Sequence, residues 1–244
     1  PFLFISRQMK GTLFVIIGTP NSKRRSTLEK AVDSNGTKPY FLLPPELEID
    51  GLLGENWQWN KKQFTSESIQ SDKQNEWFLL LSHEIDLADQ IEGVLELVNE
   101  NEELNVGRII TFVNSELLKT NGINLRDWLD ACAHFSDAMC FSNRQNDNAE
   151  SISKSIDRFK DKCYPMQTFI IGSKKSPPLN RILTTIPLRV SHILDPKDLL
   201  DPEAVSYTHL RAHETLMNLV CRLLLEKTPS RDPHPQEPTH YSRA

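Results

Sequence analysis

Short, mostly apolar runs recur along the chain and alternate with amphipathic stretches. Runs of four or five residues bounded by polar or turn residues are typical of strands that are buried on both faces of a parallel sheet. Six such runs are present, at residues 13–17, 40–43, 77–81, 109–113, 138–141 and 167–171. The pattern therefore predicts a sheet of at least six strands.

Apolar residues at helical spacing lie between these runs. They predict helices over 86–99, around 125–135 and around 152–159. Residues 26–29 read Ser-Thr-Leu-Glu, a capping box that predicts a helix start at Ser26. Residues 46–75 are polar and irregular, with two tryptophans spaced as in a half-buried strand. Alternating strands and helices predict an α/β fold, with a mostly parallel sheet and helices on both faces.

The two ends of the chain differ from the rest. Residues 204–227 resemble a translated sequencing adapter, with two matched blocks around a variable gap of three residues. We therefore expect 204–244 to be an artefactual tail, disordered or a stray helix, and 1–8 to be an uncertain leader before Met9. The remaining chain is expected to form one domain over 9–172. The Pro-interrupted residues 173–203 are expected to be a linker or the start of a truncated second domain.

Charge and cysteine usage exclude several classes of protein. The 244 residues include 28 Lys+Arg and 33 Asp+Glu, for a formal charge of −5. Without 204–244, 23 basic and 29 acidic residues remain, a net of −6. This acidic balance argues against a nucleic-acid surface. No apolar run approaches the ~20 residues of a membrane helix, so we expect a cytoplasmic protein. Four cysteines without a C-x-x-C spacing argue against a disulfide scaffold and a Cys-only zinc site.

The loop at 18–27 carries the strongest candidate chemistry. It joins a buried strand to a helix, where backbone N–H groups and a helix N-terminus favour an anion. The phosphate-loop pattern G-x-x-x-x-G-K-[ST] is degenerate here, because Lys23, Arg24 and Arg25 stand in its last three places. A shift by one residue aligns Arg25 with the lysine but lengthens the loop. The predicted phosphate-binding residues are Gly18, Ser22, Lys23, Arg24, Arg25, Ser26 and Thr27. The alternative is a solvated basic turn.

Residues 9–172 resemble the CobW/HypB/UreG-type P-loop GTPases in the order of their elements. The resemblance rests on four places: the loop 18–27, Leu-Ala-Asp at 87–89, Ile-Ile-Thr-Phe-Val-Asn at 109–114, and Asn-Arg-Gln-Asn at 143–146 after Phe-Ser-Asp at 135–137. In the family these places are the phosphate loop, a Gly-Leu-Ala-Asp-Pro stretch, a Val-Val-Asp strand end and the guanine-reading Asn-Lys-x-Asp. The resemblance implies a P-loop NTPase (G-domain-like) fold.

The resemblance also implies ligands. GTP or GDP would be bound, with Asn143, Arg144 and Asn146 facing the base and Mg²⁺ weakly held by Ser26 and Asp86. The chain departs from the family at several of these places. Asp86 replaces a glycine, Asn114 and Asn146 each replace an aspartate, and the metal-binding Cys-x-Cys-Cys stretch is absent from 40–75. Base discrimination and metal delivery are therefore weakened, and no residue is assigned a catalytic role.

Three hypotheses follow from these residues. The first is a nucleotide-binding G-domain protein with weak or absent hydrolysis. The second is a pseudo-GTPase, in which the fold serves as a protein-interaction module with a protein partner. The third is another α/β enzyme, such as a small-molecule kinase or transferase. Stabilisation by nucleotide separates the first from the second, and base selectivity separates the first from the third.

Overall fold

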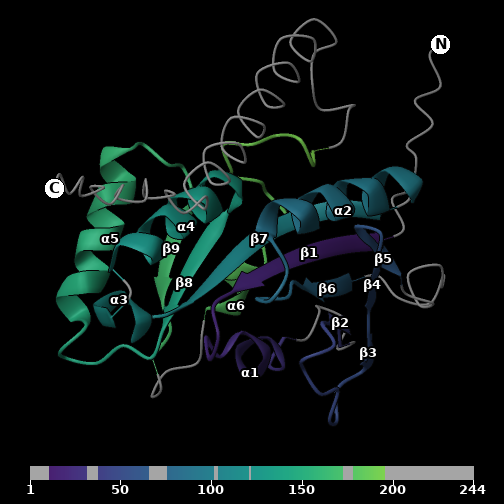
Figure 1. Ribbon diagram of the computed structural model, residues 1–244, viewed down its shortest axis with the longest axis horizontal. Helices are drawn as coiled ribbons and strands as arrows, with labels where there is room; N and C mark the ends of the chain where they lie inside the picture. The colour runs from purple at the N-terminus through teal and green to yellow at the C-terminus, as the bar shows by residue number, and fades with distance from the viewer. Residues whose placement is uncertain are drawn as a thin grey trace, which may run out of the picture.

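The computed structural model describes residues 11–31, 38–65, 76–101, 104–120, 122–172 and 178–195. Seven parallel strands form one sheet in the order β3-β2-β6-β1-β7-β8-β9 (Figure 1). They are β1 (Gly11–Gly18), β2 (Tyr40–Leu43), β3 (Gly54–Asn56), β6 (Glu76–Leu80), β7 (Leu104–Asn114), β8 (Ala138–Ser142) and β9 (Gln167–Ile170). All six predicted strands are therefore confirmed. The expected leader 1–8 and tail 204–244 lie outside the described residues.

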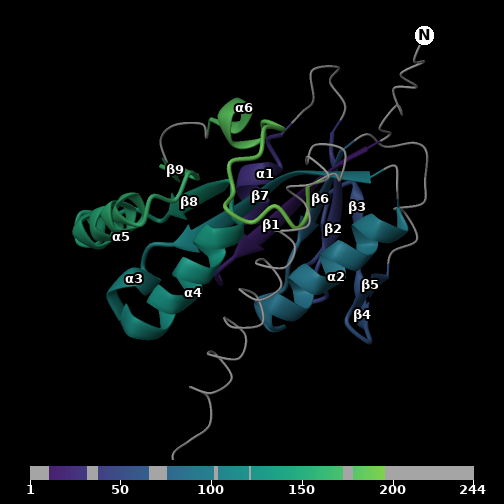
Figure 2. The ribbon, with the colours of Figure 1, turned by 90° about the horizontal axis from the view of Figure 1, so that it is seen from above.

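Helices cover both faces of the sheet. They are α1 (Arg24–Leu28), α2 (Leu87–Glu100), α3 (Leu117–Thr120), α4 (Gly122–Phe135), α5 (Ala149–Asp161) and α6 (Leu179–Ile182). Seen from above, α2 and α4 lie on one side of the strands and α1 and α6 on the other (Figure 2). This arrangement confirms the predicted α/β class, a parallel sheet with helices on both faces. Among the described residues, no helix has both the length and the apolar character to cross a membrane.

Two apolar clusters, one on each face of the sheet, form the core. Successive strand residues point to opposite faces, so Leu13, Val15 and Ile17 join one cluster while Phe14 and Ile16 join the other. The first cluster includes the apolar faces of α2, α4 and α5, and the second includes residues of α1 and α6. Burial on both faces explains why the strand sequences are continuously apolar rather than alternating.

Three local features differ from the sequence prediction. Helix α1 begins at Arg24, so Ser26 lies inside the helix and its hydroxyl donates to the carbonyl of Lys23 at 3.2 Å. The expected capping box is therefore wrong, and Glu29 pairs with Arg25 instead. The irregular region contains β3 and a hairpin of β4 (Gln58–Asn60) and β5 (Gln63–Thr65). This hairpin contacts α2 and places an aromatic cluster on the sheet.

Residues 178–195 pack against the sheet, although the sequence indicated a linker or the start of a second domain. Asp137, which immediately precedes β8, is fully buried and forms a salt bridge with Arg189 at 2.7 Å. The guanidinium of Arg108 in β7 donates to the carbonyls of Arg181 and Ile186. Because these buried charged groups bond to residues of 178–195, this segment is a strap that belongs to the same packed body as the sheet.

Candidate functional site

The strand order places a topological switch point at the carboxyl edge of the sheet, between β1 and β7. The chain leaves β1 toward β2 on one side and leaves β7 toward β8 on the other, while β1 and β7 are neighbours. Ligands of open α/β sheets bind at such a switch point, beyond the carboxyl ends of the strands. The loop 18–23 lies at this point, together with the loop that follows Asn114, the last residue of β7.

The loop 18–23 has an unusual backbone. Asn21 and Lys23 have φ values of 56° and 58°, in the left-handed region that favours glycine. Lys23 stands where the phosphate-loop pattern has its second glycine, so it holds the glycine-like conformation without being glycine. Helix α1 that follows has five residues. The anion-binding potential of this loop therefore depends on its side chains more than on the helix.

Replacing Lys23 with glycine is expected to stabilise the protein by about 0.5–1 kcal/mol. Glycine removes the strain of a left-handed L-residue, and its extra freedom in the unfolded chain offsets part of that gain. Urea denaturation would measure the change. Lys23→Ala removes the same charge but keeps the strain, so it should not stabilise. A stability gain in both variants would attribute the effect to charge and contradict the backbone argument.

Arg24 points into the edge of the sheet beneath the loop. Its Nη1 donates to the carbonyl of Leu81 at 2.6 Å and to that of Ile16 at 3.3 Å, and the residue is 6% exposed. A Cβ added to Gly18 would lie 2.6 Å from Cδ of Arg24 and 3.2 Å from its Nε. Gly18 is therefore needed because the arginine stem passes directly under it.

The environment of Arg24 is unfavourable for its positive charge. Desolvation by burial lowers the pKa of the guanidinium to about 10, and the charge of Glu46 acts in the opposite direction. Two backbone carbonyls satisfy Nη1 but carry no full negative charge. A buried cation of this kind gains stability when an anion comes within hydrogen-bond distance.

The other residues of the predicted phosphate set have different surroundings. Arg25 ties α1 to the loop before β3, with bonds to the carbonyls of Ile49 and Asp50 at 3.3 and 2.9 Å. Ser22 and Thr27 are buried, whereas Lys23 and Ser26 are exposed. Arg25 thus connects α1 to the loop before β3, which leaves Lys23 and Arg24 as the other two cations of the predicted phosphate set.

Hydrogen bonds join the loop after β1 to the ends of β7 and β8. The hydroxyl of Thr19 accepts from the N–H of Asn114 at 2.8 Å. The side-chain amide of Asn143 donates to the carbonyl of Asn21 at 3.1 Å and to Oδ1 of Asn114 at 2.9 Å. The structure therefore brings Asn143, predicted to face the base, against the predicted phosphate loop.

Arg144 and Asn146 lie on the exposed turn that follows Asn143. Buried Asn148 holds this turn, because its side chain accepts from the N–H of Gln145 and donates to the carbonyl of Asn143. Asp147 forms an ion pair with Lys119, and this hydrogen bond lowers the pKa of its carboxyl group. The carboxylate of Asp147 therefore pairs with a residue of α3, and we do not count it among the base-binding residues.

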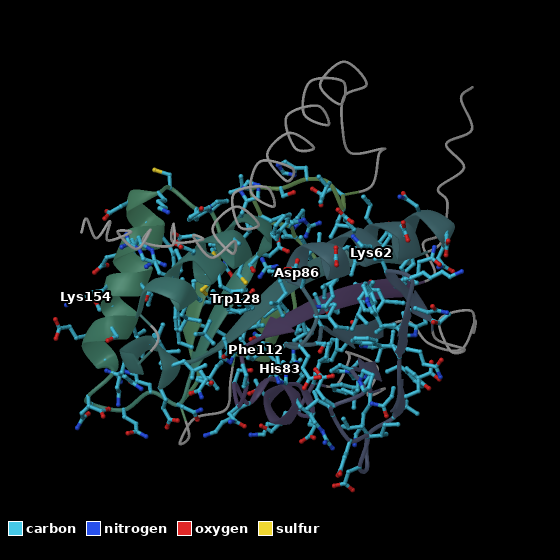
Figure 3. All side chains as sticks on the ribbon, viewed as in Figure 1. Lys62, His83, Asp86, Phe112, Trp128 and Lys154 are labelled. Atoms are coloured by element: carbon cyan, nitrogen blue, oxygen red, sulfur yellow. The ribbon has the colours of Figure 1, made fainter. Side chains whose placement is uncertain are left out.

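The two predicted Mg²⁺ ligands, Ser26 and Asp86, make hydrogen bonds to different partners. Asp86 caps α2, where its carboxylate accepts from the N–H of Ala88 at 2.9 Å, and the hydroxyl of Ser26 is bonded within α1. Figure 3 shows Asp86 near α2, whereas His83 lies toward α1. Within the described residues, no group of three or more His, Cys, Asp or Glu side chains is arranged to hold a metal ion. A Mg²⁺ ion at Ser26 and Asp86 stays a prediction.

No protein-family model matches this sequence, and no curated protein matches it. Among solved structures, the chain is similar to the Zn(II)-bound YjiA GTPase from E. coli, with 8% identity and a TM-score of 0.47. The match covers 77% of this chain and 65% of that one, so the chain spans less than two-thirds of the length of that GTPase. At this level of similarity the assignment of the site rests on its own geometry.

Glu46 is a site residue that the sequence analysis missed. It lies in the turn after β2, and its Oε1 accepts from the hydroxyl of Ser82 at 2.6 Å. His83 is a further neighbour, with Nδ1 3.4 Å from the same oxygen. A signal was present, because Glu46 follows a predicted strand and so belongs to the carboxyl edge of the sheet. The sequence alone did not show that β2 and β6 are neighbours.

Proposed function

We propose that this chain is a nucleotide-binding G-domain-like protein that binds GTP or GDP, with weak or absent hydrolysis. The proposal includes Mg²⁺ as a cofactor and a cytoplasmic location. The observation that carries it is the buried guanidinium of Arg24, which lies under Gly18 at the switch point of the sheet. A phosphate there would supply the negative charge that this group lacks.

The arrangement of the neighbouring loops supports a nucleotide rather than a simple anion. Asn143 links the loop 18–23 to the turn that carries Arg144 and Asn146, so phosphate and base contacts would come from adjoining segments. Weak hydrolysis follows from the residues themselves. Arg25 replaces the hydroxyl that binds Mg²⁺ in the phosphate-loop pattern, and phosphoryl transfer depends on that metal and on a positioned water.

A second candidate function is a protein-interaction module that binds no nucleotide. It is favoured by the hydrogen bonds of Thr19, Asn114 and Asn143, through which polar groups at the switch point satisfy one another within the protein. Under this hypothesis Arg24 is a structural residue that fills the space beneath the loop.

A thermal-shift panel on the full chain separates these candidates. GTP, GDP, XTP and ATP are each added with and without Mg²⁺. Saturation at 100 times Kd adds ~2.7 kcal/mol of stability, which is readily measured. A shift with guanine or xanthine nucleotides alone supports the G-domain proposal, and a Mg²⁺-dependent increase supports the metal. The absence of a shift with every nucleotide, on a cooperatively folded sample, supports the interaction module.

A further inference from the structure

Glu46 connects the turn after β2 to the end of β6. Its carboxylate accepts a hydrogen bond from the hydroxyl of Ser82 at 2.6 Å and lies 3.4 Å from Nδ1 of His83, and its side chain is 17% exposed. The hydroxyl of Ser82 also accepts from the N–H of Glu84 at 3.0 Å, which fixes its orientation. Glu46 is therefore held at the carboxyl edge of the sheet by the loop that follows β6.

The same loop connects Glu46 to Arg24. Arg24 donates to the carbonyl of Leu81, and Glu46 accepts from the side chain of the next residue, Ser82. Both charged groups are thus anchored at one strand end. The negative charge of Glu46 raises the pKa of Arg24 against the effect of burial. In the absence of another anion, Glu46 is the carboxylate among the described residues that partly compensates the buried cation.

We propose that Glu46 is an internal anion that competes with the phosphate of a bound nucleotide for Arg24. The inference rests on the proposed function, because it requires a phosphate at Arg24. A phosphate at Arg24 and the carboxylate of Glu46 would both lie at the end of β6, and two negative groups there repel each other in a partly buried site, where charges are screened less than in water. Binding of phosphate must overcome this repulsion or move the turn that carries Glu46.

Under this proposal, Glu46 limits the affinity of the site for phosphate. Glu46→Gln removes the negative charge and keeps a carbonyl oxygen that can accept from Ser82. Binding should then become roughly tenfold tighter, which corresponds to about 1.4 kcal/mol. Glu48 is a matched control, since it is exposed and lies two residues further along the chain. Glu48→Gln makes the same change in net charge but should leave the affinity unchanged.

The test is calorimetric titration of the full chain with inorganic pyrophosphate and, separately, with GDP. Pyrophosphate reports on the phosphate site without a base. Circular dichroism melting confirms that each variant is folded. If Glu46→Gln is not folded, Glu46→Ala is used in its place. The expected result is tighter binding of both ligands by the Glu46 variant and no change in Glu48→Gln. Detectable binding in the Glu46 variant alone also supports the proposal.

Three other results would overturn the proposal, and they differ in what they imply for nucleotide binding. If the unmodified chain binds and the Glu46 variant binds equally or more weakly, the competition is wrong and nucleotide binding stands. If neither the unmodified chain nor any folded variant binds either ligand, both the competition and the proposed function are wrong. A tenfold gain in Glu48→Gln as well would assign the effect to net charge and would also overturn the role of Glu46.

Discussion

Replacing Asp137 with alanine is expected to lower the free energy of unfolding by about 3–5 kcal/mol. Asp137 is fully buried and accepts hydrogen bonds from the N–H groups of Ile109 and Leu188 and from the guanidinium of Arg189. Its loss leaves the buried charge of Arg189 with Asp195 alone and leaves two backbone donors without an acceptor. The penalty is large because water cannot reach these groups to replace the carboxylate.

Guanidinium chloride denaturation, followed by circular dichroism, would measure this loss. Asp130→Ala is the control, because Asp130 forms ion pairs with Arg158 and Lys162 nearer the surface and should cost about 1 kcal/mol. Asp137→Asn keeps the size and one acceptor, so an intermediate loss is expected. A loss in Asp137→Ala no larger than that in Asp130→Ala would show that the strap 178–195 is not held in the way described.

The main elements of the fold were predictable because burial on both faces gives the strands their continuous apolar runs. Helices α2, α4 and α5 were predictable from apolar residues at helical spacing. Helices α3 and α6 have four residues each, too few to show a period. The hairpin of β4 and β5 depends on tryptophan packing against α2, which a local pattern does not reveal.

The strap could not be predicted because its stability comes from distant partners. Arg189 and Asp137 are 52 residues apart, and Arg108 bonds residues more than 70 positions away. Prolines interrupt the local sequence there, which indicates a linker. The buried charge network becomes visible only when β7 and β8 bring these residues together.

The candidate site was predictable in part for a simple geometric reason. The loops that follow parallel strands lie at the same edge of the sheet, so the loops at Gly18 and Asn143 belong to one edge, and a hydrogen bond from Asn143 to Asn21 joins them. The direction of each side chain was not predictable. Arg24 and Arg25 are adjacent in sequence, yet one enters the sheet edge and the other ties α1 to Asp50.

Replacing Arg24 with alanine is expected to abolish the stabilisation by nucleotide, a loss of the full ~2.7 kcal/mol seen at 100 times Kd. The guanidinium is the buried cation at the switch point, and a bidentate bond to phosphate depends on its planar donors. The variant should also lose stability by itself, by about 1–3 kcal/mol, since the carbonyls of Leu81 and Ile16 lose a donor. Thermal shift with saturating GDP measures both effects in one experiment.

Two neighbouring variants separate a specific role of Arg24 from the removal of any positive charge. Lys23→Gly and Arg25→Ala each remove one cation from the same loop and helix, but Lys23 is exposed and Arg25 is bonded to the turn at Asp50. Both should keep most of the nucleotide shift, whereas Arg24→Ala should show none. Arg24→Lys keeps a charge without the planar fork and should retain part of the shift. An unchanged nucleotide shift in folded Arg24→Ala would show that the phosphate does not bind at this loop. An equal loss of the shift in all the variants would show that binding depends on overall positive charge and not on Arg24 specifically.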